Sequence, residues 1–298
     1  MSKRTVFMTL LCGTDDIPFA RLLIESLREF GGAMKDSPFW LFYKEQKVQP
    51  GEVFRDLQVD THPVSIPESI RFYPFGSKVA ACAAAEELAR QGQVNSLISI
   101  DTNCLILNPP VLQDLGDEFD AAFRPVHIRN VGSSLGQPLD VFWQGIYSAL
   151  GVQELPLSVT SYVDRQPLRA YFNTHSFAFR PSLGLMARWI DLFQALVTDR
   201  DFQARACSDQ MYQIFLFQAV LSTLIASSLK PERIRLLPPT YNYPYNLQLQ
   251  IPQEIRAAAM NDLVSATFED RPMHPDLIFD IEIREPLRSW LVERLRPN

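Results

Sequence analysis

The feature that most constrains the fold is a short apolar stretch, residues 97–100, which ends abruptly in the polar segment 101–103. A helix rich in small residues is predicted before it, over 77–90, and a second apolar segment, 104–107, follows it. Short, continuously apolar strands fed by helices are typical of parallel sheets that are covered on both faces. Such sheets bind ligands at the carboxyl ends of their strands, so the segment 101–103 marks the expected ligand-binding edge.

Strand and helix patterns alternate along the rest of the chain as well. Up to residue 101 the alternation favours right-handed βαβ units in a parallel sheet. We therefore expect an α/β protein with a Rossmann-type sheet flanked by helices. Strands are predicted at 5–11, 39–43, 64–66, 97–101, 104–107, 119–124, 171–179 and 263–268, and helices at 18–30, 77–90, 141–150, from 182 to about 197, from 208 or 209 to 229, and at 286–295.

Length and composition allow one large domain or two modest ones. The chain has 298 residues, of which 47% are hydrophobic, enough for a packed core. No internal repeat and no linker rich in Pro, Gly or Ser divides it, so one domain over 1–298 is expected. The net charge of −6 gives no general attraction to nucleic acid, which is not an expected partner.

Three features predict a cytoplasmic protein without an integral membrane segment. The four cysteines stand far apart, with no C-x-x-C pair, and are expected to be reduced thiols. The apolar run 5–11 is short and leads into Gly13 rather than a cleavage site, which indicates a first strand and not a signal peptide. The longest apolar segment, 211–229, is interrupted by Gln, Ser and Thr, which favours a helix buried in the core.

Asp101 and Asn103 are the first candidate site residues. They stand two apart on a turn that leaves a strand, so their oxygens can point into one small volume. Carboxylate and amide oxygens are ligands for hard divalent cations such as Mn²⁺ or Mg²⁺, which complete their coordination with phosphate oxygens and water. The alternative is that both side chains only cap the turn through bonds to the backbone.

Lys78 lies in the first turn of the predicted helix 77–90. The helix dipole disfavours a cation there, whereas the free backbone N–H groups attract anions. A lysine in this place is explained if phosphate binds nearby, and the alternative is an ordinary solvated surface lysine.

Further polar residues follow or interrupt apolar segments. Glu269 or His274, after the last strand, could supply a third metal ligand, or His274 could be a solvated loop histidine. Asn173 and Asp209 could bind sugar hydroxyls, but a strand end and a helix cap would look the same. His62 and His127 are interpreted as plain loop residues. No Ser/His/Asp triad, Walker loop or G-x-G-x-x-G pattern is recognisable.

Several of these segments, in their order and spacing, resemble the GT-A nucleotide-diphosphosugar transferases, particularly the bacterial glycosyltransferase-8-like branch, over most of the chain. The segments that carry the resemblance are 75–78 (FGSK), 97–110 with D-T-N in place of D-x-D, 171–181 with F-N-T and R-P, 208–210 with D-Q, and 237–243 with L-P and Y-N.

The resemblance implies a GT-A-like mixed sheet, with a nucleotide-binding half over 1–110 and an acceptor or closing half over 111–298. It also implies a sugar transfer from a nucleoside-diphosphate sugar to an unknown acceptor, with Mn²⁺ or Mg²⁺ drawing charge off the diphosphate. The implied substrate-binding residues are Cys12, Gly13, Lys78, Asn173, His175, Asp209 and Gln210, and the implied metal ligands are Asp101, Asn103 and His274.

Three departures from the family pattern bear on activity. Asn103 replaces the second Asp of D-x-D and is a weaker ligand, and His175 replaces a glycine and would fill space expected for donor sugar. The late metal-binding His has no clean match, since Glu269 stands in that region with His274 displaced. The alternatives are therefore a GT-A-like binding or scaffold protein without transferase activity, or another α/β nucleotide-binding enzyme.

Overall fold

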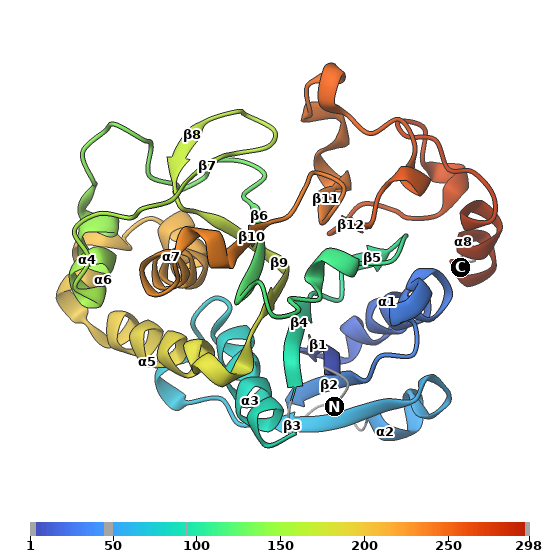
Figure 1. The fold of residues 1–298 in the computed structure, drawn as a ribbon, viewed down its shortest axis with the longest axis horizontal. Coiled ribbons are helices and arrows are strands. Elements are labelled where there is room, and N and C mark those ends of the chain that lie inside the picture. The colour runs from blue at the N-terminus through green and yellow to red at the C-terminus, as the bar shows by residue number, and fades with distance from the viewer. Residues whose placement is uncertain (1–3, 45–49, 93, 296–298) are drawn as a thin grey trace.

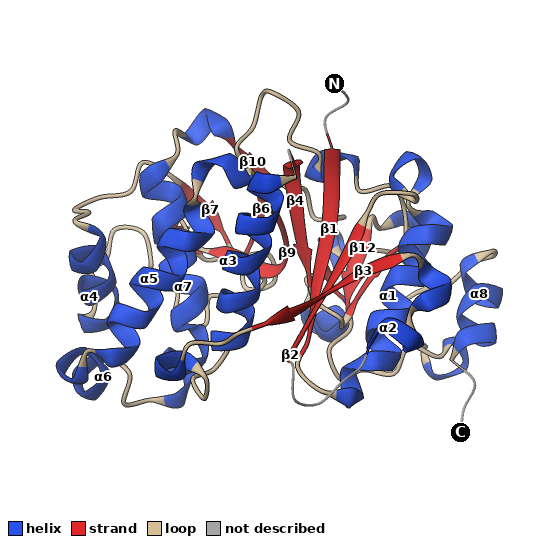
Figure 2. Ribbon diagram, turned by 90° about the horizontal axis from the view of Figure 1, so that it is seen from below, coloured by secondary structure: helices blue, strands red, loops and turns tan. Residues whose placement is uncertain are grey.

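A seven-stranded sheet forms the centre of the computed structural model, which describes residues 4–44, 50–92 and 94–295. Helices cover both faces of the sheet, and the last part of the chain packs at one end of it (Figures 1 and 2). In spatial order the strands are β10 (Ile234–Leu236), β6 (Ala121–Pro125), β9 (Phe172–Phe179), β4 (Val94–Ile100), β1 (Arg4–Leu11), β2 (Phe39–Lys44) and β3 (Val59–Val64).

The direction of β9 makes the sheet mixed. This strand pairs antiparallel with both of its neighbours, β4 and β6. The other neighbouring strands, from β4 through β1 and β2 to β3, and β6 with β10, are parallel. The expected α/β class with a mixed sheet flanked by helices is therefore confirmed, and strands from both predicted halves of the chain share this sheet.

Successive side chains along each strand enter two different cores. On β4, Leu97 packs in the core on the side of α3, α5 and α7, whereas Ile98 packs in the core on the side of α1. This two-sided burial explains why the strands read as continuously apolar. The helices are α1 (Ile17–Phe30), α2 (Pro50–Val53), α3 (Gly76–Gln91), α4 (Val141–Leu150), α5 (Leu185–Thr198), α6 (Arg200–Ala206), α7 (Gln210–Ser228) and α8 (Leu287–Arg294).

A smaller, three-stranded sheet lies beside the carboxyl end of β4 (Figure 1). Its strand β5 (Cys104–Ile106) follows β4 after a turn and pairs antiparallel with β12 (Ser265–Thr267), next to β11 (Tyr243–Pro244). This pairing brings residues from the late part of the chain next to the polar turn at 101–103. A separate two-stranded hairpin consists of β7 (Ser158–Thr160) and β8 (Pro167–Arg169).

Two predicted boundaries are wrong. The third strand is Val59–Val64, not 64–66, and it contains His62, which was expected in a loop. This strand lies at the edge of the sheet, where a polar sequence with a proline is tolerated. The helix predicted to begin at Ser182 begins at Leu185. Gly184 precedes it with a φ of 65°, a left-handed conformation that glycine adopts without strain, so the chain turns once more before the helix starts.

The long apolar helix is α7, and its middle is fully enclosed by the protein. Within the described residues it is the one helix with the length and hydropathy of a membrane span, and 61% of that window is buried. The indole N–H of Trp189 on α5 donates to the carbonyl of Phe217 on α7, at 2.9 Å. The predicted buried core helix is thus what the structure contains.

Asp120, immediately before β6, joins three strands through two arginines. Its carboxylate accepts hydrogen bonds from Arg180 at 2.9 Å and from Arg233 at 2.6 and 2.8 Å. The Arg233 bonds, with a smaller effect from Arg180, lower the pKa of Asp120 despite its burial. The unfolded-state pKa of an Asp is about 4, and the folded-state pKa of Asp120 is lower. The ionised carboxylate therefore stabilises the protein above about pH 4, and this stabilisation is lost as the pH falls through the folded-state pKa.

We predict that Asp120→Asn lowers the Tm by about 3 °C at neutral pH, because the amide keeps the shape but loses the charge-assisted bonds. The difference between the two proteins should shrink below about pH 4. Thermal unfolding followed by circular dichroism over a pH series measures both effects. A difference that is constant with pH would contradict this role of the Asp120 charge.

Candidate functional site

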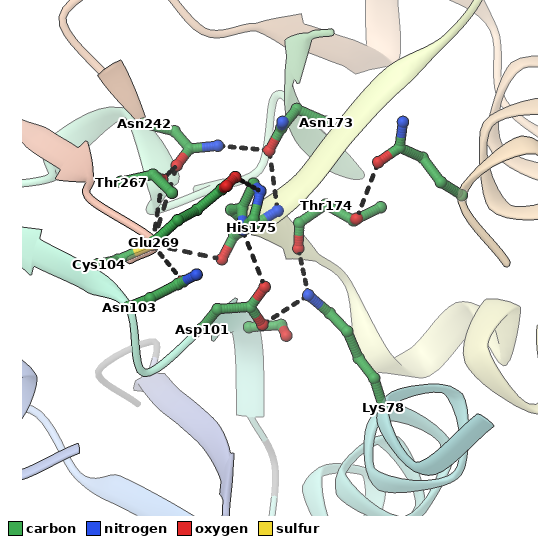
Figure 3. Close-up of polar contacts among 12 residues, drawn as sticks. Lys78, Asp101, Asn103, Cys104, Asn173, Thr174, His175, Asn242, Thr267 and Glu269 are labelled. Atoms are coloured by element: carbon green, nitrogen blue, oxygen red, sulfur yellow. Dashed lines mark hydrogen bonds and ion pairs between the residues drawn. The ribbon is translucent and has the colours of Figure 1, made fainter. Parts of the chain in front are cut away.

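Asp101 lies directly beyond the last residue of β4, at the carboxyl edge of the sheet. Its backbone N–H donates to the carbonyl of His175 on β9 at 2.8 Å, which fixes the start of the turn. Its Oδ1 accepts a hydrogen bond from Lys78 Nζ at 2.6 Å, and the same ammonium donates to the carbonyl of Thr174 at 2.6 Å (Figure 3). The predicted ligand edge is therefore occupied by an ion pair between α3 and β4.

Lys78 reaches Asp101 because the first turn of α3 is itself buried. Phe75, before the helix, has a φ of 59°, and a Cβ on Gly76 would meet the Ile70 carbonyl oxygen at 2.1 Å, so only glycine fits there. Lys78 is 7% exposed. The alternative of a solvated surface lysine is therefore wrong, and Asp101 offsets the unfavourable position of this cation at the helix N-terminus.

His175 lies between two carboxylates. Its Nδ1 is 3.2 Å from Asp101 Oδ2, and its Nε2 is 3.5 Å from Glu269 Oε1. Burial would lower the pKa of His175, but the two carboxylates outweigh burial and raise it. Burial would likewise raise the pKa of Asp101, but Lys78 and His175 lower it. The hydrogen bond to His175 also lowers the pKa of Glu269.

Asn242, at a left-handed φ of 46°, links β9 to the small sheet. Its side-chain amide donates to the Oδ1 of Asn173, and its own Oδ1 accepts from Thr267 (Figure 3). Asn173 Oδ1 also accepts from the backbone N–H of His175 at 2.8 Å. The Nε2 of His127 lies 2.9 Å from the Asn242 carbonyl, which it reaches as a donor in the neutral ring.

His127 is therefore part of the site, and its interpretation as a plain loop residue is wrong. It is 7% exposed, and its ring stacks on that of His175 with 6.3 Å between centroids. Burial, together with the positive charge of Arg124, lowers the pKa of His127 well below its usual value. His127 follows β6, and it reaches the site because β6 pairs with β9, the strand that carries Asn173 and His175. The sequence does not show this pairing.

A cavity of about 100 Å³ adjoins the ion-paired residues. Such a volume holds several waters but is small beside typical ligand pockets, about 300–1,000 Å³, so it suits one part of a ligand. Its wall combines one carboxylate, two imidazoles and several amides with apolar side chains. The residues lining it are Val126, His127, Ile128, Asn130, Asn173, His175, Phe215, Gln218, Asn246, Leu247 and Glu269.

The structure brings four predicted residues into contact: Lys78, Asp101, Asn173 and His175. Asn103 follows Asp101 on the turn, and its Oδ1 lies 3.8 Å from the Cys104 thiol. Asn242 and Thr267 are among the residues of this candidate site that the sequence analysis did not single out, because only tertiary pairing brings them next to β5 and β9. The one available signal for Asn242 was its place in the Y-N motif.

Cys12 and Gly13 leave β1 at the same edge at which Asp101 leaves β4, since the two strands are parallel neighbours. Their backbone N–H groups both donate to Asp16 Oδ2, at 2.6 and 3.2 Å, which closes the turn. Burial raises the pKa of the Cys12 thiol. The turn therefore lies at the carboxyl edge of the sheet beside β4, and its role in binding the nucleotide stays a prediction.

Asp209 and Gln210 are exposed at the start of α7, where Asp209 caps the helix by accepting from the Met211 N–H at 2.8 Å. The residues of α7 that reach the cavity are Phe215 and Gln218, and Gln218 accepts from Thr174 at 3.1 Å. Gln218 lies eight residues after Gln210, about 12 Å along the helix. The cap that was the alternative for Asp209 is what the structure contains.

The described residues do not form a ready divalent-cation site. Both Asp101 oxygens already have cationic or N–H partners, and Asn103 adds no charge. His274 instead caps its own turn, where its Nδ1 accepts from the Asp276 N–H at 3.3 Å. In the described part of the chain, no group of three His, Cys, Asp or Glu residues could hold a metal ion. The Mn²⁺ or Mg²⁺ implied by the family resemblance stays a prediction.

The sequence matches the family model described as "Rhodobacterales glycosyltransferase domain" over residues 19–228, well over half of the chain. This match includes β4, the Asp101 turn, α3 and β9. No curated protein matches the sequence.

Two solved structures superpose on this chain at low sequence identity. The WbbM bifunctional glycosyltransferase superposes with a TM-score of 0.56 at 13% identity, over 99% of this chain and 50% of its own, so this chain spans about half its length. Mouse xyloside xylosyltransferase 1 gives a TM-score of 0.48 at 13% identity, over 90% of this chain and 97% of its own. The first likeness confirms the GT-A-like fold predicted from the sequence.

Proposed function

Because the chain belongs to the Rhodobacterales glycosyltransferase domain family, we propose that it transfers a sugar from a nucleoside-diphosphate sugar to an acceptor at the carboxyl edge of β4. The observation that carries this proposal is the ion pair of the buried Lys78 with the partly exposed Asp101 at that edge, joined through His175 to a polar cavity. An ammonium at a helix N-terminus is suited to a diphosphate.

The cavity supports the sugar-binding part of this proposal. Sugar hydroxyls both donate and accept hydrogen bonds, and the cavity wall offers both roles: amide groups from Asn130, Gln218 and Asn246, and the Glu269 carboxylate. Asn246 Oδ1 is buried without a hydrogen-bond partner, so it is an acceptor left for a ligand hydroxyl. The Phe215 ring in the same wall can pack against the apolar face of a sugar.

The second candidate is a GT-A-like binding or scaffold protein. Two residues favour it: Asn103, which stands where the family has a carboxylate, and His175, which stands where it has a glycine and occupies one side of the cavity. This protein would bind a nucleotide or a sugar without transferring it.

Calorimetric titration with UDP, GDP and their sugar conjugates, followed by assays of donor hydrolysis, tests the proposal. We expect one nucleotide to bind and its sugar conjugate to be hydrolysed slowly in the absence of acceptor. Binding without hydrolysis would support the second candidate. If none of these nucleotides binds with or without Mn²⁺, the transferase proposal is wrong.

Lys78→Met should weaken nucleotide binding by about tenfold or more, because it removes a charge-assisted hydrogen bond to phosphate. Arg90→Met is the matched control, since Arg90 is an exposed cation twelve residues further along the same helix, about 18 Å away. Equal effects of the two changes would show that Lys78 contributes only to the general electrostatic field.

A further inference from the structure

We propose that the ammonium of Lys78 takes the place of the divalent cation at the donor site, so that the diphosphate binds without added metal. This proposal rests on the proposed function, because it concerns how the same donor is held. It is carried by the contacts of Asp101, of Lys78 and of His175.

The first observation is that each oxygen of the Asp101 carboxylate already faces a nitrogen of a basic side chain. Oδ1 accepts from Lys78 Nζ at 2.6 Å, and Oδ2 faces His175 Nδ1 at 3.2 Å. A divalent cation bound to Oδ1 would have to lie beside the Lys78 ammonium, and the two like charges would repel each other in a partly buried site. Metal binding would therefore require Lys78 to leave its position.

The second observation is that the Lys78 ammonium donates hydrogen bonds to two oxygen atoms whose positions are fixed by the sheet. It donates to a carboxylate of the β4 edge and to the Thr174 carbonyl of β9, both at 2.6 Å. Two of its three N–H donors are thereby used, and one is left for a phosphate oxygen. Because the side chain is 7% exposed, little rotamer freedom is lost when a ligand binds.

The third observation is that the residues next to Asp101, namely Asn103 and His175, are poorly suited to complete the coordination of a divalent cation. Asn103 contributes a neutral amide, and the ring nitrogens of His175 face the carboxylates of Asp101, at 3.2 Å, and of Glu269, at 3.5 Å. Hard divalent ions are held chiefly by carboxylates and phosphate. One carboxylate that is already paired with lysine is a poor match, whereas the lysine itself matches a diphosphate.

The N-terminus of α3 adds to the attraction. This helix has 16 residues, and no side chain forms a hydrogen bond that caps its first turn. The dipole of a helix of this length favours an anion at that end. Lys78 and the first turn of α3 therefore act on the same phosphate from one side, and Asp101 keeps the ammonium in place.

The test is the affinity of the full chain for UDP and GDP, measured by calorimetry with excess EDTA and then with Mn²⁺ or Mg²⁺. We expect the dissociation constant to change by less than about twofold between these conditions. Binding that requires Mn²⁺ or Mg²⁺ and vanishes in EDTA would overturn the proposal and leave the proposed function intact. Absence of nucleotide binding in every condition would overturn both.

Three variants sharpen the test. Lys78→Met should lose nucleotide affinity by about tenfold in EDTA, and Lys78→Arg, which keeps the charge, should retain more of it. Lys78→Met combined with Asn103→Asp presents two carboxylates with the ammonium removed, and we expect its nucleotide binding to become dependent on Mn²⁺. Unchanged affinity of folded Lys78→Met in EDTA would also overturn the proposal; circular dichroism and thermal unfolding verify its folding.

Discussion

Asp101→Asn is expected to lower the free energy of unfolding by about 3 kcal/mol, although the amide has nearly the same shape as the carboxylate. The Lys78 ammonium would remain buried without a countercharge. The amide also has one acceptor oxygen, so it can accept from Lys78 or from His175 but not from both. Asp101 retains 26% exposure of its side chain, which places the expected loss at the lower end for a broken buried pair.

Urea denaturation of Asp101→Asn and of the wild type measures this loss. The matched control is the double variant Lys78→Met and Asp101→Asn, which removes both charges. We expect the double variant to be more stable than Asp101→Asn alone, because no unpaired ammonium is left in the site. If the two variants are equally unstable, the loss comes from packing and not from the charge pair.

Asn242→Ala is expected to lower the free energy of unfolding by about 3 kcal/mol. The change removes the bonds to Asn173 and Thr267 and leaves buried polar groups without partners. Alanine at a φ of 46° is also strained by about 1–2 kcal/mol. Since Asn173 accepts from the backbone of His175, the cavity wall should change shape, and nucleotide affinity should fall as well.

Asn242→Gly separates the two causes. Glycine adopts the left-handed backbone without strain but makes none of the side-chain bonds, so it should be less damaging than alanine by about 1 kcal/mol. Urea denaturation of both variants gives the difference. Alanine and glycine variants of equal stability would mean that the backbone conformation at this position contributes little.

The local pattern around residues 97–107 was sufficient to place β4, the polar turn and β5. The apolar run is uninterrupted because β4 is buried on both faces, and the polar residue Asp101 follows it because the chain becomes partly exposed where the strand ends. The helix that carries Lys78 could also be predicted from the sequence, because its Ala-rich face allows α3 to lie against the sheet. These are properties of contiguous segments.

The ion-pair and hydrogen-bond partners of these residues could not be predicted from the sequence. His175 was predicted by motif to fill donor space, but nothing local indicated that its ring would lie between Asp101 and Glu269, which are 74 and 94 residues away along the chain. His127 was taken as a loop residue because its burial comes from β9 and Asn242, not from its own neighbours. Asp209 kept its local role as a helix cap.

The sequence alone determined the α/β class, the buried strand that ends in Asp101 and the helix that presents Lys78, because each depends on hydrophobic periodicity and backbone preferences within one segment. Only the tertiary structure decided that β9 runs antiparallel between β4 and β6, and that Lys78 pairs with Asp101 instead of reaching solvent. Those outcomes depend on charges and hydrogen bonds between segments that are distant in the sequence. Such interactions form only when the folded sheet brings the segments together.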